Sequence, residues 1–138
     1  NLLSTNDIKK TYIAILKGKF KNKKIIENEI HKNNSLKLKK SKTIFKLVRQ
    51  LKNTSIVNVD LYTGRTHQIR IHASQINHPI LFDKKYGDKM FDCSINLNFK
   101  KTLALHSKSI SFKDQNSKII KANASYPDQF KKLIKALK

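Results

Sequence analysis

Four stretches of the chain alternate apolar and polar positions, which is the period of β-strands that bury one face. They cover residues 43–51, 55–62, 103–112 and 117–126. Asn53 separates the first two and a polar turn at residues 113–116 separates the last two, so each pair predicts an antiparallel hairpin. A further strand is predicted over residues 11–16, where a run rich in β-branched and aromatic residues stops before Gly18.

Residues 19–42 show a weaker pattern. The segment is polar and lysine-rich, with a small apolar core at Ile25, Ile26 and Ile30. It is either an insertion that contacts a partner or a hairpin packed against the sheet, and we favour the hairpin.

The period changes to that of a helix after Gly64. Ile69, Ala73 and Ile76 are spaced i, i+4, i+7, so they form one stripe of a helix predicted over residues 66–76. The adjoining stripe is polar and cationic, and it holds Thr66, His67, Arg70 and Ser74. The predicted helix therefore has one face for a core and one for a ligand, and Pro79 closes it.

The rest of the chain completes an α+β pattern. Residues 81–88 predict a strand or loop ending in a glycine turn, and residues 91–101 fit either a helix or a loop. A last helix is predicted over residues 127–138, with Pro127 at its first position and an apolar stripe along it. We expect an α+β fold with a mixed, mostly antiparallel sheet and flanking helices. No internal repeat or linker divides residues 1–138.

Composition adds a charge argument of limited weight. The chain has 138 residues with 30 Lys and Arg against nine Asp and Glu, a formal net charge of +21. Such an excess is typical of proteins with a polyanionic partner. Lys, Asn and Ile dominate together, however, which is also the pattern that an AT-rich genome produces on a solvated surface. Charge alone is therefore equally compatible with nucleic-acid binding and with codon bias.

Other features of the sequence bear on the cellular compartment of the protein and on whether the chain is a piece of a longer one. The only cysteine, Cys93, excludes an internal disulfide and favours a reducing, cytoplasmic compartment. No apolar run approaches the roughly 18 residues of a membrane span. The chain begins at Asn1 rather than at Met, and residues 1–10 resemble the tail of a helix entering a strand. We therefore expect a piece of a longer protein.

Arginine is rare in this lysine-rich chain, so its positions are informative. Arg65 and Arg70, two of three arginines, lie within the ten residues TGRTHQIRIH, with two of the five histidines. A planar guanidinium pairs with carboxylate or phosphate through two parallel hydrogen bonds, which lysine cannot do. Each arginine is a candidate for such a pair, and a simple salt bridge to the sheet explains it equally well.

A metal centre or a cysteine nucleophile fits the sequence poorly. His67 and His72 are five residues apart, so they diverge on a helix, and no Glu lies between them as in a zinc-binding HExxH motif. No histidine or helix start accompanies Cys93 to lower its pKa. We expect no metal and assign mostly structural roles to His72, His78 and His106.

Three segments together resemble the successive motifs of the RluA-type pseudouridine synthases, which modify ribosomal RNA. They are KTYIAILKG, TGRTHQIRIHASQINHPILFDKKYGD and LALHSKSISF. Within that family, HPILFDKKYGDKMFD resembles most closely the RluC-like enzymes of the bacterial large ribosomal subunit. The resemblance runs from about Lys10 to the final helix. It implies an isomerase that converts uridine to pseudouridine in large-subunit ribosomal RNA without metal or cofactor, and we expect a monomer.

The resemblance also implies roles for single residues. Arg70, at the arginine of HQIR, would pair with the catalytic aspartate and keep it ionised. Tyr12, at the tyrosine of the K-x-Y strand, would pack against the target uracil and help to remove the C5 proton, and Ile69 would line the pocket beside the base. Arg65 and His67 would contact backbone phosphates or fix the turn. Without the resemblance, Tyr12 is an ordinary strand aromatic and His67 simply bonds a carbonyl.

One departure from the family pattern matters. The catalytic aspartate of these enzymes belongs to an HRLD-type stretch before the K-x-Y strand, and nothing of that kind precedes Thr11. Asp83 and Asp88 are expected to shape the YGD turn rather than to attack a ribose. Arg70 is thus expected to lack its partner in this chain.

We therefore interpret residues 1–138 as the C-terminal portion of a pseudouridine synthase catalytic domain, inactive alone. Two alternatives stay open. The chain is a basic RNA-binding module that keeps the scaffold without catalysis, or it is a degraded remnant that does not unfold cooperatively. Tyr12 and Arg70 separate the first alternative from a synthase, because a pure binder would lose them at little cost.

Overall fold

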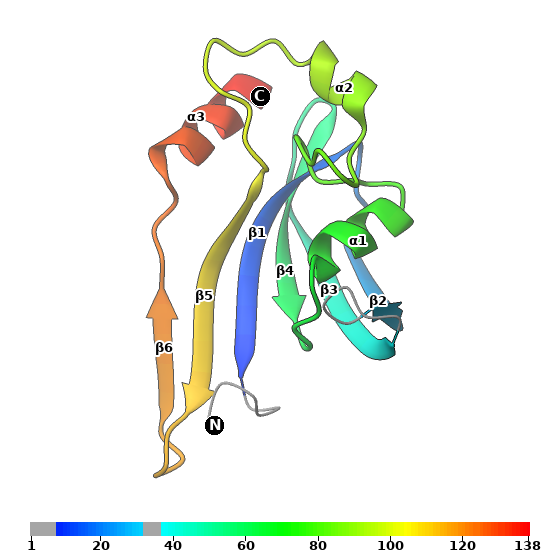
Figure 1. Cartoon of the computed structure of the whole chain (residues 1–138). Helices are drawn as coiled ribbons and strands as arrows, with labels where there is room; N and C mark the ends of the chain where they lie inside the picture. The colour runs from blue at the N-terminus through cyan, green and yellow to red at the C-terminus, as the bar shows by residue number, and fades with distance from the viewer. Residues whose placement is uncertain (1–7, 32–36) are drawn as a thin grey trace.

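Six strands form an antiparallel sheet that carries the rest of the described chain (Figure 1). The computed structural model describes residues 8–31 and 37–138. The strands are β1 (Lys9–Lys17), β2 (Lys23–His31), β3 (Leu38–Gln50), β4 (Thr54–Leu61), β5 (Leu105–Lys113) and β6 (Ile119–Asn123). Their order is β2-β3-β4-β1-β5-β6, and each neighbouring pair is antiparallel. The α+β class is confirmed, and none of the described strand pairs is parallel.

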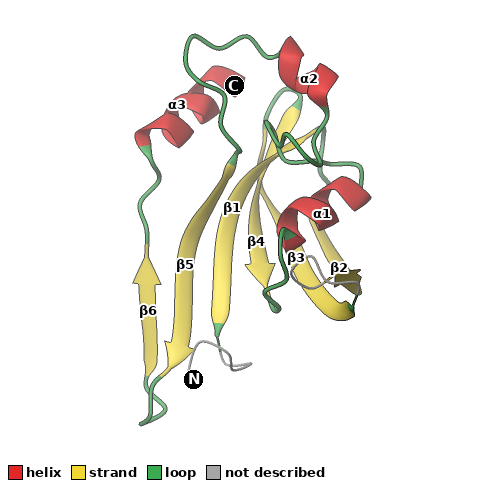
Figure 2. Ribbon diagram, viewed as in Figure 1, coloured by secondary structure: helices red, strands yellow, loops and turns green. Residues whose placement is uncertain are grey.

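Three helices accompany the sheet in the same described ranges: α1 (Gln68–Gln75), α2 (Lys89–Ser94) and α3 (Asp128–Leu137). In Figure 2, α1 and α2 lie on the side of the molecule that holds β2, β3 and β4, and α3 lies beyond the arrow tip of β6, at the end of the sheet where β5 starts. Helix α1 begins two residues later than predicted, because His67 adopts a left-handed backbone with φ 55°. Pro127 precedes α3 instead of opening it, since its ψ of 149° is extended.

The described parts of residues 19–42 pair as antiparallel strands, in agreement with the hairpin that the sequence favoured. β2 pairs with β3 from Lys23 opposite Lys46 to His31 opposite Leu38. β3 therefore begins at Leu38, ahead of the predicted start at residue 43. The apolar pattern hides residues 38–42 because their buried position, Ser41, is polar.

The segment after α1 contains no strand, so the loop reading of residues 81–88 is correct. Ile80 makes one isolated bridge to Leu16, and the Leu81 N–H donates to the Ile15 carbonyl at 3.0 Å. The Leu81 carbonyl accepts from the N–H of Ala104 at 3.1 Å. These bonds fasten the loop to β1 and to the residue that precedes β5. Of residues 91–101, only the start is helical, within α2, and the rest is a loop.

The sheet register places Tyr12 on the face that α1 covers. Residues directly opposite each other in a sheet share a face. Tyr12 lies opposite Val59, and Val59 lies opposite Phe45, two residues along β3 from Thr43. Thr43 contacts α1 through side-chain hydrogen bonds, so Tyr12 points toward the same side of the sheet.

The hydrophobic core lies between this sheet and the segments packed on it. Its fully buried members include Ile15, Leu16, Phe45, Val57 and Leu81. α3 joins the core through Phe130 and Leu133, two residues of the stripe predicted from the sequence. The expected helix tail at the start of the chain falls mainly on residues 1–7, outside the described residues. No helix in the described part is long and apolar enough to cross a membrane.

Candidate active site

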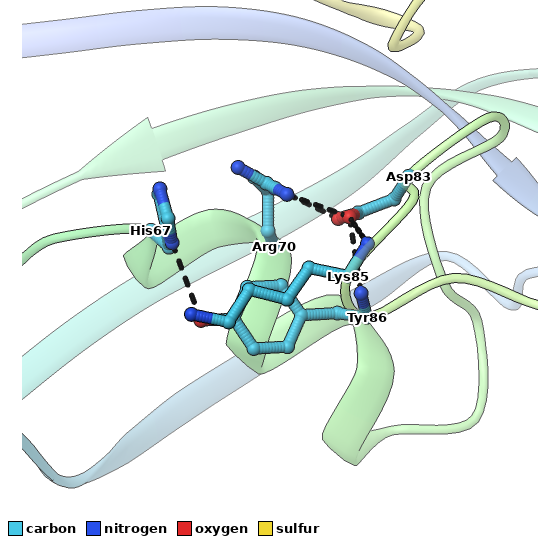
Figure 3. Close-up of polar contacts among 5 residues, drawn as sticks. All are labelled: His67, Arg70, Asp83, Lys85 and Tyr86. Atoms are coloured by element: carbon cyan, nitrogen blue, oxygen red, sulfur yellow. Dashed lines mark hydrogen bonds and ion pairs between the residues drawn. The ribbon is translucent and has the colours of Figure 1, made fainter.

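Arg70 on α1 is held by Asp83 in a two-bond ion pair (Figure 3). The Arg70 Nε donates to Asp83 Oδ2 at 2.9 Å, and Nη2 donates to Oδ1 at 2.7 Å. The Asp83 side chain is 1% exposed and that of Arg70 is 20% exposed. The loop after α1 thus brings a carboxylate to Arg70, which the sequence analysis did not foresee, and the expected absence of an HRLD-type catalytic aspartate stays a prediction.

A tight turn at residues 83–87 fixes the Asp83 carboxylate. Its Oδ1 accepts from the backbone N–H groups of Lys85 and Tyr86, each at 3.0 Å. The Gly87 N–H donates to the Asp83 carbonyl at 3.0 Å, and a Cβ atom at Gly87 would lie only 2.3 Å from that oxygen. Asp83 thus shapes the YGD turn, as the sequence predicted, in addition to binding Arg70.

Phe82 aims this turn at α1 through an unusual backbone. Its φ is 62°, in the left-handed region that bulky residues rarely occupy, and its side chain is buried. Such a conformation costs about 1–3 kcal/mol and persists only where surrounding contacts compensate. Strain of this kind next to a buried ion pair is typical of functional sites.

Tyr86 covers the guanidinium of Arg70. Its ring centroid lies 5.2 Å from Arg70 Cζ, within the range of a cation–π contact. Its hydroxyl lies 3.2 Å from Nδ1 of His67, whose ring meets it edge-on. His67 thus contacts a tyrosine hydroxyl that none of its predicted roles named, and Tyr86 is a site residue that the motif analysis missed.

The protonation states of this cluster follow from its contacts. Burial would raise the pKa of Asp83, but hydrogen bonds from Arg70, Tyr86 and Lys85 hold it below its usual range. The hydrogen bond to Asp83 raises the pKa of Arg70 against the effect of burial. Partial burial, with the charges of Arg70 and Lys85, lowers the pKa of His67. At neutral pH the site is thus an ionised pair beside a neutral imidazole.

Asp83 is unsuited to act as a nucleophile. Its two oxygens receive four hydrogen bonds, two from Arg70 and two from the backbone. With 1% of the side chain exposed, no ribose carbon has access to these oxygens. Asp83 can hold an arginine, but it cannot replace a catalytic aspartate.

Buried polar side chains anchor α1 on the sheet. Gln68 donates from Nε2 to the Lys42 carbonyl at 3.0 Å and to Thr43 Oγ1 at 2.9 Å, and its Oε1 accepts from Thr63 Oγ1 at 2.6 Å. His72 Nε2 lies 2.9 Å from Asn28 Oδ1 on β2. His72 is completely buried, in agreement with the structural role expected for it. This network sets where α1 presents Arg70.

The other predicted site residues take different positions. Ile69 is 5% exposed and belongs to the hydrophobic core, whereas Tyr12 is half-buried at its edge. Arg65 donates from Nε to the Lys40 carbonyl at 3.1 Å, which fixes the turn before α1. His78 and His106 contact backbone carbonyls of Lys17 and Ser125. The roles proposed for Tyr12, Ile69, Arg65 and His67 toward a substrate stay predictions.

Residues 8–31 and 37–138 contain no group of three or more His, Cys, Asp or Glu arranged to hold a metal ion. Cys93 is exposed on α2 and is a free thiol.

Comparison with protein families places this geometry in a known context. The family model described as RNA pseudouridylate synthase matches residues 1–75. The chain is 34% identical to ribosomal large subunit pseudouridine synthase C of Haemophilus influenzae, over 99% of this chain and 46% of that protein. It is 41% identical to the protein of that name from Buchnera aphidicola subsp. Schizaphis graminum, over 76% of this chain and 32% of that protein. The chain thus spans about half the length, or less, of these curated relatives.

Solved structures show the same fold. Human RNA pseudouridylate synthase domain containing 1 superposes with a TM-score of 0.74 at 20% identity, over 96% of this chain and 66% of that one. The human domain-containing 4 protein gives 0.75 at 17% identity, over 99% of this chain and 64% of that one. At these identities the likeness concerns the fold alone.

Proposed function

The chain belongs to the RNA pseudouridylate synthase family, and from this premise we propose that it is the C-terminal portion of an RluC-like catalytic domain. The whole protein would isomerise uridines in large-subunit ribosomal RNA. The observation that carries the proposal is that Arg70 is already held in place by Asp83. Arg70 stands in the HQIR motif, is mostly buried, and keeps N–H groups beyond the two bound by Asp83.

The proposed reaction exchanges one glycosidic bond for another. A catalytic aspartate from outside the described residues opens the N1–C1′ bond of uridine, the base turns within the pocket, and C5 bonds to C1′. C5 then loses its proton to solvent and N1 gains one, so the reaction is an isomerisation. Tyr12 would pack against the uracil and assist the loss of the C5 proton, and Ile69 would shape the pocket wall behind the base.

Arg70 supplies what this chemistry requires of the protein. A carboxylate in a closed pocket loses hydration, which raises its pKa and favours the unreactive acid. A guanidinium within about 4–6 Å opposes that shift and fixes the carboxylate geometry. The target nucleotide must also leave its stack, and an aromatic side chain such as Tyr12 offsets the lost stacking.

The partner in this proposal is ribosomal RNA. The net charge of +21 suits a polyanion, and Arg65 and His67 lie at the start of α1, where they would meet backbone phosphates. We infer a cytoplasmic enzyme that acts as a monomer without metal or cofactor.

A non-catalytic RNA-binding module is the second candidate. One observation favours it: Asp83 already neutralises Arg70 inside residues 8–31 and 37–138, so the fold does not need a further carboxylate. Both candidates bind RNA with a steep salt dependence, and they differ only in catalysis.

Tritium release from ribosomal RNA labelled at uridine C5 separates these candidates. Two proteins are assayed, residues 1–138 alone and the product of the whole reading frame that contains them. We expect release only from the second, and an in-frame HRLD-like stretch in the coding sequence that precedes Asn1. Release by residues 1–138 alone would contradict the inactivity of the chain. A folded whole-frame product that binds ribosomal RNA without releasing tritium would favour the binding module.

A further inference from the structure

The Arg70 guanidinium is engaged along one edge only. Arginine carries five N–H donors, and Asp83 accepts from Nε and from one hydrogen of Nη2. Within residues 8–31 and 37–138, Nη1 makes no hydrogen bond and one nitrogen points away from Asp83 (Figure 3). The remaining hydrogens of Nη1 and Nη2 form a second fork, which matches a carboxylate in the same two-bond geometry.

We propose that Asp83 is a positioning residue that clamps Arg70 along the Nε edge, so that the opposite fork is presented to the catalytic aspartate. This inference rests on the proposed function. Arg70 would then bridge two carboxylates, one structural and one reactive. Asp83 acts through Arg70 and touches neither substrate nor reacting atoms.

The clamp is rigid because both of its ends are fixed. Asp83 is held by the N–H groups of Lys85 and Tyr86 and by the close approach of Gly87. α1 is held to β3 by the buried side chains of Gln68 and His72. An arginine on a free side chain would lose rotamer freedom on pairing with its aspartate, whereas Arg70 has already lost it on folding.

Tyr86 completes the clamp by covering one face of the guanidinium. Its ring lies 5.2 Å from Arg70 Cζ, and its hydroxyl meets His67 at 3.2 Å. Together Asp83 blocks rotation within the guanidinium plane and Tyr86 blocks tilting out of it. A groove of about 540 Å³ opens on the far side of Tyr86 and His67, toward β2 and β3.

The clamp has an electrostatic consequence that a purely structural aspartate would not have. Asp83 offsets the Arg70 charge, so Arg70 lowers the pKa of a second carboxylate less than a free arginine would. Removing the Asp83 charge should lower the pKa of the catalytic aspartate. The charged or titratable groups of the described residues that face Asp83 come from three segments. They are Arg70 from α1 and His67 just before it, Lys85 and Tyr86 from the turn, and Asp92 from α2.

Asp83→Asn is the sharpest variant in the whole-frame protein. Its Oδ1 still accepts from Lys85 and Tyr86, whereas an amide in place of Oδ2 meets the Arg70 Nε donor to donor. We expect kcat for tritium release to fall about 100-fold with KM unchanged. The acid limb of the kcat/KM profile should also move to lower pH by about one unit.

Asp88→Asn is the matched control. Asp88 lies in the same loop, caps α2 by accepting from the Phe91 N–H, and pairs with Lys17, but it does not contact Arg70. Asparagine caps helices as well as aspartate does, so rate and pH profile should stay within about two-fold of the parent protein.

A second measurement needs no activity. In the ¹⁵N NMR spectrum of residues 1–138, the Arg70 Nε–H should exchange with water at least about 10-fold more slowly than that of exposed Arg49. Equal exchange rates would overturn the clamp even where Asp83→Asn does not fold. An Asp83→Asn protein that keeps its rate, or loses rate without a shift of the acid limb, would overturn it too. A parent protein without tritium release contradicts the proposed function instead, and the exchange measurement still decides whether Asp83 holds Arg70.

Discussion

His72 Nδ1 lies 2.7 Å from Thr43 Oγ1, in the buried layer between α1 and β3. Asn28 Oδ1 can only accept, so the proton of the neutral imidazole is assigned to Nε2, and Nδ1 accepts from the Thr43 hydroxyl. The ring is thus neutral, fully bonded and completely buried. It connects the helix that carries Arg70 to both β2 and β3, which pair with each other.

This contact predicts a loss of stability in mild acid. Burial lowers the pKa of His72 from 6.5 to about 4. Between pH 6.5 and pH 4, the imidazole is therefore protonated in the unfolded chain but neutral in the folded chain. The free energy of unfolding should therefore fall by about 2 kcal/mol between pH 7 and pH 5. Asp83, with its pKa below the usual carboxyl range, loses its contribution only at lower pH. Urea unfolding of residues 1–138 at a series of pH values measures the slope.

His72→Gln is the control for this slope. Glutamine does not titrate, so the variant should be less stable at pH 7 but nearly flat from pH 7 to pH 5. An unchanged slope in His72→Gln would assign the acid sensitivity to another group.

The turn that carries Asp83 should tolerate no side chain at Gly87. A Cβ atom there would lie 2.3 Å from the Asp83 carbonyl oxygen, so the backbone must shift. We expect Gly87→Ala to cost about 1–3 kcal/mol. Gly64→Ala is the matched control, because its nearest contact is the flexible end of Lys10 at 3.9 Å, and it should stay within about 0.5 kcal/mol. Equal unfolding free energies for the two variants would contradict the tight turn.

Arg70 and Asp83 should be strongly coupled in stability. Arg70→Met alone leaves the Asp83 carboxylate buried without its cation, which costs about 3–5 kcal/mol when a buried pair loses one partner. In an Asp83→Asn background the same change should cost less, since no charge is left behind. A double-mutant cycle by urea unfolding measures the difference, which we expect at about 1–3 kcal/mol. Additive costs would mean that the ion pair does not form.

Tyr12 separates catalysis from binding. In the whole-frame protein, Tyr12→Phe keeps the ring that would stack on the uracil and loses the hydroxyl. We expect tritium release to fall at least about 10-fold while affinity for ribosomal RNA stays within about two-fold. Steady-state kinetics and a filter-binding titration at fixed salt check both. If Tyr12→Phe releases tritium at the rate of the parent protein, the Tyr12 hydroxyl takes no part in the proton transfer.

Most strands and the two longer helices could be predicted from the period of their apolar positions. In α1, Ile69 and Ala73 mark the buried stripe, whereas the alternation over residues 117–126 does not correspond to burial, because every residue of β6 is exposed. The first residues of β3, 38–42, were not predicted because their buried position is Ser41, which serves as a hydrogen-bond partner of His72 and not as an apolar residue.

The pairing of Arg70 with Asp83 could not be predicted from the local sequence pattern. Asp83 lies 13 residues further along the chain, and the path between them depends on backbone bonds of Leu81 and on the left-handed φ of Phe82. Neither the backbone bonds of Leu81 nor the φ angle of Phe82 can be recognised from the residue types alone. Tyr86 could have been noticed from the YGD motif, but its place over Arg70 follows only once the turn has formed.

The central claim is that Arg70 serves a pseudouridine synthase, and tritium release from C5-labelled ribosomal RNA tests it most directly. The whole-frame protein and its Arg70→Lys variant, which keeps the charge but loses the two-pronged fork, are compared after both are shown to be folded. We predict release by the parent protein and a fall of at least about 100-fold in the variant. Equal release by both proteins, or none from the folded parent, would contradict the account.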